Sequence, residues 1–156
     1  MICRAVKGGY ASGMLQAQPH TVGDVMSRQI IAVSPDDEIG NILDSMEKLR
    51  FRHLPVVEGD KLVGVVTQKD LLHASSSFLS DKAAQRDELI GHTKVRAIMQ
   101  QEVLTVSETD SLAETGRLMW EAKIGCVPVV GDDDELVGIL TESDFIRIAL
   151  WYMGNS

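Results

Sequence analysis

GVVTQKD at residues 64–70 returns later in the chain as GILTESD at residues 138–144. Each copy has a glycine, two apolar residues, a threonine, two polar residues and an aspartate. Thr-x-x-Asp directly after an apolar run is typical of a helix N-terminus, where the threonine caps the helix and the aspartate bonds back to it. Each motif therefore predicts the end of a strand followed by the first turn of a helix.

The motif belongs to a longer internal repeat. Aligning Met26 with Met99 places the main apolar runs of the first half on those of the second, with one residue added in a loop. The matched positions cover roughly fifty residues in a single register, which indicates a duplication. The aligned segments are 21–26 with 94–99, 30–34 with 103–107, 54–57 with 127–130, and 64–70 with 138–144.

Both repeats are expected to have the element order β-α-β-β-α. In the first repeat, Ser34 is expected to cap a helix that has Pro35 at its first position and an apolar stripe continuing to Leu49. The strands are short and continuously apolar, which indicates burial on both faces. The expected strands are 30–33, 54–57 and 62–66, then 103–106, 127–130 and 136–140. The expected helices start at 34 and 68 in the first repeat and cover 112–122 and 142–150 in the second.

The predicted fold class is α+β, with two α/β-like units in tandem. A unit of about fifty-five residues is marginal alone, so the two units are expected to pack together. The expected parts are an N-terminal arm (1–19), a first unit (20–75), a polar and partly helical connector (76–92), a second unit (93–150) and a C-terminal tail (151–156).

The composition excludes several classes of function. The chain has 156 residues, 44% of them hydrophobic and 24% charged, as in globular domains. Its net charge of -8 argues against nucleic-acid binding. Cys3 and Cys126 lack metal-ligand spacing, which argues against a metal site and favours a reducing, cytoplasmic compartment. No apolar run reaches the ~20 residues of a membrane span. The sequence shows no pairing of a nucleophile with a base of the kind found in enzymes, which argues against catalysis.

The repeated units, each with an apolar strand ending in PVV, a turn and a Thr-x-x-Asp motif, closely resemble a tandem pair of cystathionine-β-synthase (CBS) domains. The resemblance covers about residues 20–150. It implies units packed through their sheets with pseudo-two-fold symmetry and two clefts between them. Such clefts bind adenine-containing ligands such as AMP, ADP, ATP or S-adenosylmethionine, as regulatory ligands rather than required cofactors. The resemblance also implies a homodimer that regulates an enzyme, channel or transporter and has no catalytic activity.

The resemblance carries the family's ligand residues onto matching positions of this chain. The aspartates would hold the ribose hydroxyls, and the threonines would lie near the ribose or phosphate. Positions around each PVV strand and at the end of the first strand would line the adenine through backbone groups and apolar side chains. These positions are Thr67, Asp70, His53, Leu54, Pro55 and Val33 in the first unit, and Thr141, Asp144, Cys126, Val127, Pro128 and Val106 in the second.

Several features have a structural alternative. The Thr-x-x-Asp motifs suit helix capping without any ligand. The cations of residues 50–53 fit either a helix C-terminus or a ligand phosphate, and Arg147 fits either a phosphate or a surface ion pair. Because Lys69 lies within the first motif and Glu142 within the second, the two clefts are expected to be unequal.

Two further features stay open at this point. Trp120 lies off the apolar stripe of its helix and is either locally packed or a subunit contact. The acidic run Asp132-Asp133-Asp134 is interpreted as a solvated loop rather than a cation site. The alternative to a ligand sensor is a ligand-free module for structural or protein–protein contacts.

Overall fold

The coordinates come from a computed structural model that describes residues 4–6, 18–49, 51–77 and 92–154. Most of the expected N-terminal arm and connector lies outside the described residues. The chain forms two compact units. Unit 1 contains Met1–Arg4 and Ile31–Val103, and unit 2 contains Ala5–Ile30 and Leu104–Ser156. These units do not coincide with the two sequence repeats, because each contains a piece of the other repeat.

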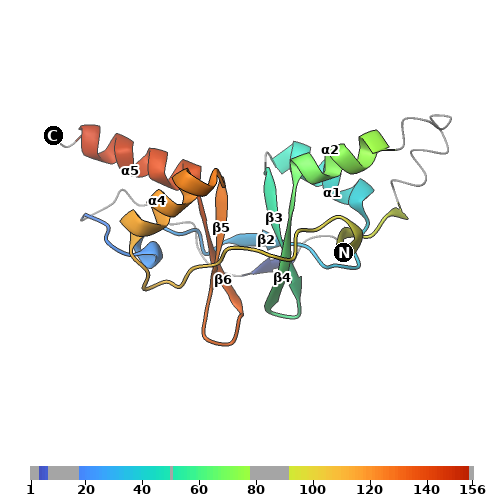
Figure 1. Ribbon diagram of the computed structural model, residues 1–156, viewed down its shortest axis with the longest axis horizontal. Coiled ribbons are helices and arrows are strands. Elements are labelled where there is room, and N and C mark those ends of the chain that lie inside the picture. Colours follow the sequence, from blue (N-terminus) through green and yellow to red (C-terminus); the bar gives the residue numbers. More distant parts are fainter. Residues whose placement is uncertain (1–3, 7–17, 50, 78–91, 155–156) are drawn as a thin grey trace. The chain divides into compact units, whose positions relative to one another are not determined.

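Unit 1 is built on one β-hairpin with two helices. Figure 1 shows α1 and α2 beside the hairpin formed by β3 and β4. The helix α2 starts at the residue directly after β4 ends, as the motif at residues 64–70 predicts. The elements are β3 (His53–Glu58), β4 (Lys61–Thr67), α1 (Ile39–Leu49), α2 (Gln68–Ser77) and the 3-10 turn η2 (Val95–Ala97). The strands β1 (Arg4–Val6) and β2 (Ile30–Ala32) pair with each other, and neither belongs wholly to one unit.

Unit 2 repeats this plan. Its hairpin is β5 (Cys126–Val130) with β6 (Leu136–Thr141), and its helices are α4 (Leu112–Ala122) and α5 (Glu142–Gly154). The helix expected over residues 112–122 is confirmed at both ends. The helix expected over residues 142–150 starts as predicted but continues to Gly154. The 3-10 turn η1 (Val22–Asp24) completes the unit.

Each unit has its own aliphatic core. The strands and helices contribute side chains that are almost fully buried, and each core also takes in side chains from the segment that begins the opposite repeat. The core of unit 1 contains Val33, Ile39, Ile42, Met46, Leu54, Val56, Val66, Leu71 and Val95. The core of unit 2 contains Val22, Val25, Met26, Val106, Leu112, Met119, Val127, Val129 and Leu140.

The two repeats thus exchange their first segments. Residues 92–100 begin the second repeat but pack in unit 1, where Val65 and Gln100 donate a backbone hydrogen bond to each other's carbonyl, both of 2.9 Å. Residues 20–28 begin the first repeat but pack in unit 2, where Ser27 and Ile139 form the same pair at 2.9 and 3.0 Å. Figure 1 shows residues 92–100 in yellow along the hairpin.

The helix start expected at Ser34 is wrong. The backbone N–H of Ser34 donates to Asp37 Oδ2 at 2.8 Å and closes a turn, and α1 begins only at Ile39. The carbonyl of Asp37 accepts a hydrogen bond from the N–H of Val95 at 3.0 Å. Ser and Asp suit such a turn as well as a helix cap. The turn therefore holds the exchanged segment instead of starting the helix.

The strand expected over residues 103–106 is also wrong. In the described part of the chain, only Val106 pairs there, in a single parallel bridge with Val129. Its N–H donates to the Pro128 carbonyl at 3.2 Å, and its carbonyl accepts from the N–H of Val130 at 2.9 Å. The apolar run reflects burial of Val106 rather than a strand with a continuous neighbour.

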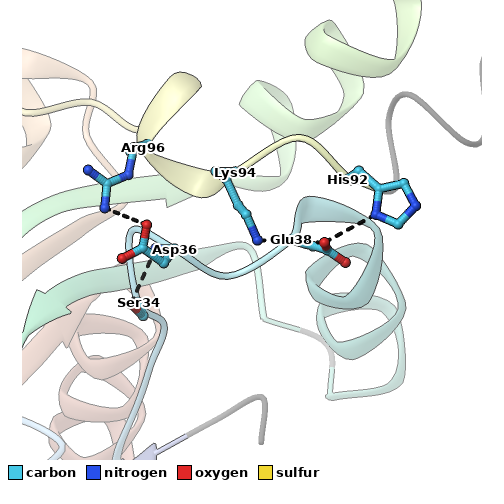
Figure 2. A network of polar contacts seen from close by, with 6 residues as sticks. All are labelled: Ser34, Asp36, Glu38, His92, Lys94 and Arg96. Carbon is cyan, nitrogen blue, oxygen red and sulfur yellow. Dashed lines mark hydrogen bonds and ion pairs between the residues drawn. The ribbon is translucent and has the colours of Figure 1, made fainter.

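Charged side chains also hold residues 92–100 in unit 1 (Figure 2). Arg96 pairs with Asp36, and Glu38 contacts Lys94 Nζ at 3.5 Å and His92 Nδ1 at 3.1 Å. The hydrogen bond from His92 is the main cause that lowers the pKa of Glu38. Exposed pairs of this kind contribute little to stability individually. They place acidic side chains of residues 36–38 opposite basic side chains of residues 92–96.

The corresponding contact in unit 2 is a single two-pronged ion pair. Arg28 donates from both Nη atoms to the two carboxylate oxygens of Glu108, each at 2.8 Å. This guanidinium lowers the pKa of Glu108 below its ordinary value. Each exchanged segment is thus held by backbone pairing and by complementary charge.

Candidate functional site

The first Thr-x-x-Asp motif forms a closed box at the start of α2. The backbone N–H and the hydroxyl of Thr67 donate to Asp70 Oδ2 at 2.8 and 2.7 Å. In return, the N–H of Asp70 donates to Thr67 Oγ1 at 3.2 Å. The capping geometry expected from the sequence is therefore confirmed. It fixes a carboxylate at the positive dipole end of a helix.

The exchanged segment supplies a further contact to this carboxylate. The side-chain amide of Gln100 donates to both oxygens of Asp70, at 3.2 and 3.3 Å. Sequence reasoning missed this residue because it lies thirty positions from Asp70 and outside every motif. One signal was present: a glycine inside a strand favours close approach of another backbone. A Cβ at Gly64 would lie 2.8 Å from the Gln100 carbonyl oxygen.

The second motif repeats both bonds from the threonine to the aspartate at the start of α5, without the return bond from the aspartate N–H. The N–H and the hydroxyl of Thr141 donate to Asp144 Oδ2 at 2.8 and 3.0 Å. Asp144 is only 6% exposed, whereas Asp70 is half-buried. Its other oxygen accepts from Arg147 Nη2 at 3.2 Å, and the same nitrogen donates to the Val25 carbonyl at 2.8 Å. The ion pair considered for Arg147 is therefore present and reaches the exchanged segment.

The PVV strands bring the other candidate residues next to the boxes. His53 lies opposite Thr67 in the first hairpin, and Cys126 lies opposite Thr141 in the second. The first N–H of α2 donates to the carbonyl of Arg52 at 2.9 Å, and that of α5 donates to the carbonyl of Gly125 at 3.1 Å. In each hairpin, the residue just before the PVV strand, Arg52 or Gly125, therefore lies at the N-terminus of the following helix.

The apolar candidate residues Val33, Leu54, Val106 and Val127 are buried. Val33 bonds to the hairpin through the carbonyl of Pro55 at 3.0 Å, and Val106 bonds to the carbonyl of Pro128 at 3.2 Å. The side chains of Leu54 and Val127 belong to the two cores, with 3% and 0% exposure. These side chains support the hairpins from within the cores. Contact with a ligand through their backbone groups stays a prediction.

Cys126 is a partly buried thiol next to the second box. Burial, with a smaller contribution from the carboxylate of Asp144, raises its pKa to about 12. The thiolate is the reactive form of cysteine, so this side chain behaves at neutral pH as a small apolar group. Cys126 is therefore not an activated nucleophile, and its contact with a ligand stays a prediction.

The remaining features give fewer indications of chemistry. Trp120 is 74% exposed, with Lys123 Nζ 4.2 Å from the ring centroid, so it is not packed in the core. A subunit contact at this ring stays a prediction. Among the described residues, no group of three or more His, Cys, Asp or Glu side chains could hold a metal ion. Nor does any described helix combine the length and apolar character needed to cross a bilayer.

Comparison with known families gives a direct match. The family model of the CBS domain matches residues 22–77 and again residues 95–150. The chain is similar to inosine-5′-monophosphate dehydrogenase of Methanocaldococcus jannaschii, with 31% identity over 125 residues that cover 80% of this chain and 22% of that enzyme. A second curated relative from this organism, an uncharacterised protein, is covered over 46% of its length. The chain therefore spans less than half the length of both relatives.

Two solved structures share the fold and contain ligands. CBSX2 in complex with AMP has a TM-score of 0.73 and 30% identity, and the match covers 86% of this chain and 99% of that one. The CBS domain pair of protein MJ0100, in complex with 5-methylthioadenosine and S-adenosyl-L-methionine, has a TM-score of 0.68 and 28% identity. That match covers 83% of this chain and 98% of the other.

Proposed function

The chain belongs to the CBS-domain family, with two CBS domains in tandem, and on that premise we propose that it is a regulatory module that binds an adenine nucleotide or a related adenosyl compound at its Thr-x-x-Asp boxes. The observation that carries this proposal is the duplication of the box. Thr67 with Asp70, and Thr141 with Asp144, form the same bonds at the start of a helix in both units. Solved CBS pairs with AMP or with S-adenosylmethionine and methylthioadenosine support this class of ligand.

The chemistry of each box suits an adenosine ligand. A carboxylate can accept hydrogen bonds from both hydroxyls of the ribose, and such charge-assisted bonds are stronger than neutral ones. The positive dipole ends at the starts of α2 and α5 favour a phosphate or another polar 5′ group there. Backbone groups of residues 53–55 and 126–128 are the candidates for the adenine edge, supported by Val33 and Val106. The ligand would take over donors and acceptors that now serve the cap.

Regulation in this proposal takes place on a second protein. The module acts in the cytoplasm as a homodimer, catalyses no reaction itself, and passes the ligand signal to an enzyme or transporter. Such a signal requires that the ligand binds one conformation more tightly than another. The contacts of Gln100 with Asp70, and of Arg147 with the Val25 carbonyl, connect each box to an exchanged segment that continues into the other repeat.

Calorimetric titration with AMP, ADP, ATP and S-adenosylmethionine tests the proposal. We expect at least one of them to bind with a Kd below about 1 mM, and Asp70→Ala and Asp144→Ala each to weaken binding at one site by about tenfold or more. Asp24→Ala is the matched control. Asp24 also accepts hydrogen bonds from backbone N–H groups, those of His20 and Thr21 at 2.9 Å, but lies outside both boxes.

Two results would count against the proposal. If none of the four compounds binds below millimolar concentration, a ligand-free interaction module becomes the better explanation. If Asp70→Ala and Asp144→Ala lower the melting temperature but leave the affinity unchanged, as expected of Asp24→Ala, the boxes are only helix caps. Sedimentation of the purified chain tests the homodimer separately.

A further inference from the structure

The two boxes share the hydrogen bonds from threonine to aspartate but carry different charges. The matched hydrogen bonds at the helix starts place Arg52 at the beginning of α2 and Gly125 at the beginning of α5. The second helical position is Lys69 in α2 and Ser143 in α5. The helix start of unit 1 therefore has two cationic residues, Lys69 and Arg52, where that of unit 2 has Ser143 and Gly125.

The first helical position increases this difference. It is Gln68 in α2 and Glu142 in α5, and both side chains are exposed. Lys69 and Arg52 are exposed too, and no described carboxylate forms an ion pair with either. Leaving aside the shared aspartates, the unit 1 box has two positive side chains and the unit 2 box has one negative side chain.

Arg147 reduces this difference without reversing it. It is the only described cation that contacts the unit 2 aspartate, one helical turn beyond the box. Its Nη2 atom is already shared between Asp144 and the carbonyl of Val25, so it neutralises a protein carboxylate rather than facing an open site. In unit 1 the neutral amide of Gln100 contacts Asp70, and no described carboxylate pairs with Lys69 or Arg52.

A phosphate is sensitive to this difference, whereas an uncharged adenosine is not. Both helix starts offer N–H groups and a positive dipole end to the 5′ group of a ligand. Lys and Arg beside such a start add attraction for a phosphate, and a glutamate at the first helical position opposes it. A thioether at the 5′ carbon carries no charge and experiences neither effect. A cationic sulfonium there is even favoured by the glutamate.

We propose that the two sites take different classes of adenosine ligand: the box of unit 1 selects a 5′-phosphorylated adenosine, and the box of unit 2 selects one whose 5′ group is uncharged or cationic. Lys69 and Glu142, with their neighbours Gln68 and Ser143, determine the choice. This inference rests on the proposed function and assigns a ligand class to each of its two sites. The chain would then report on two kinds of metabolite rather than measure one metabolite twice.

AMP and 5′-methylthioadenosine are the probes, since they share adenine and ribose and differ at the 5′ group. Each site is isolated by disabling the other: Asp144→Ala leaves the unit 1 site, and Asp70→Ala leaves the unit 2 site. Calorimetry at low salt should give AMP the tighter binding in the first variant and methylthioadenosine the tighter binding in the second. Raising NaCl should weaken AMP binding to unit 1 and leave methylthioadenosine binding unchanged.

Exchanging the motif charges provides the matched control. In the Asp144→Ala background, Gln68→Glu with Lys69→Ser gives unit 1 the charges of unit 2. In the Asp70→Ala background, Glu142→Gln with Ser143→Lys does the reverse. Because all four side chains are exposed, the fold should be retained. The preference for AMP over methylthioadenosine should fall in the first variant and rise in the second, by about tenfold in each case.

Retained binding of methylthioadenosine shows that an exchanged variant keeps its site. If both isolated sites bind both probes with the same preference, or if the exchanges leave the preference unchanged, the inference is overturned while the proposed function stands. If neither probe nor any other adenosine compound binds the unaltered chain, the proposed function itself fails.

Discussion

Replacing Asp144 with alanine should destabilise unit 2 more than the equivalent change at Asp70 destabilises unit 1. The Asp144 carboxylate is 6% exposed and accepts hydrogen bonds from the N–H and hydroxyl of Thr141 at 2.8 and 3.0 Å, and from Arg147 at 3.2 Å. Loss of a cap costs about 1 kcal/mol, and loss of a charge-assisted bond costs roughly 1.5–3 kcal/mol. The half-exposed ion pair adds less than about 1 kcal/mol.

The free energy of unfolding should therefore fall by about 3 kcal/mol in Asp144→Ala, which corresponds to roughly 6–12 °C in melting temperature for a chain of this size. Asp70→Ala should cost about 2 kcal/mol, because that carboxylate is half-buried and contacts a neutral amide. Asp144→Asn should cost about half as much as Asp144→Ala, since an amide oxygen can still accept from Thr141.

Urea unfolding followed in two ways distinguishes these effects. Both tryptophans of the chain, Trp120 and Trp151, belong to unit 2. Tryptophan fluorescence therefore follows unit 2, and far-UV circular dichroism follows both units. The midpoint by fluorescence should shift in Asp144→Ala more than in Asp70→Ala. A loss below 1 kcal/mol in Asp144→Ala, or a larger loss in Asp70→Ala, would refute the argument from burial and ion pairing.

Three further changes test other parts of the structure. Gly64→Ala places a Cβ 2.8 Å from the Gln100 carbonyl oxygen, so unit 1 should lose about 2 kcal/mol in urea; a loss within 0.5 kcal/mol of zero would contradict this close approach. The second change is Cys3→Ser, which leaves Cys126 as the one thiol. Because the pKa of Cys126 is about 12 in the folded chain, its reaction with a disulfide reagent at pH 8 should be at least ~100-fold slower in the folded chain than in the unfolded chain. Equal rates would contradict its burial. Because Arg28 lowers the pKa of Glu108 in the folded chain, their pair stabilises at neutral pH and loses its effect as pH falls through that pKa. Glu108→Gln should thus cost under about 1 kcal/mol at pH 7 and nothing once the pH lies below the lowered pKa of Glu108; a pH-independent cost would point to packing instead.

Local signals in the sequence were sufficient for most elements of the fold. An apolar run followed by Thr-x-x-Asp predicted the junctions of β4 with α2 and of β6 with α5, because one short stretch holds both the strand and the cap. The apolar stripe of α4 predicted residues 112–122 correctly. The boxes of the candidate site were predicted for the same reason: all their atoms come from four consecutive residues.

Contacts between distant segments were beyond these signals. Ser34 and Pro35 have the composition of a helix start, but their turn is used to hold Val95, sixty residues later. The run at 103–106 is apolar because Val106 is buried, and apolarity alone does not say whether a strand has a partner. The contacts of Gln100 and Arg147 with the two boxes follow from the exchange of segments, which no repeat pattern encodes.

The exchange of segments also sets an order of events during translation. Unit 1 lacks part of its core until Val95 has left the ribosome, and then has every buried residue that it needs. Val22, Val25 and Met26 emerge much earlier, but their partners in β5 and β6 follow about a hundred residues later. At roughly 5–20 residues per second, these three apolar side chains wait several seconds for a core. The segment that begins the first repeat is therefore covered only after the hairpin of the second repeat has been made, and it is the natural place for a chaperone to bind the nascent protein.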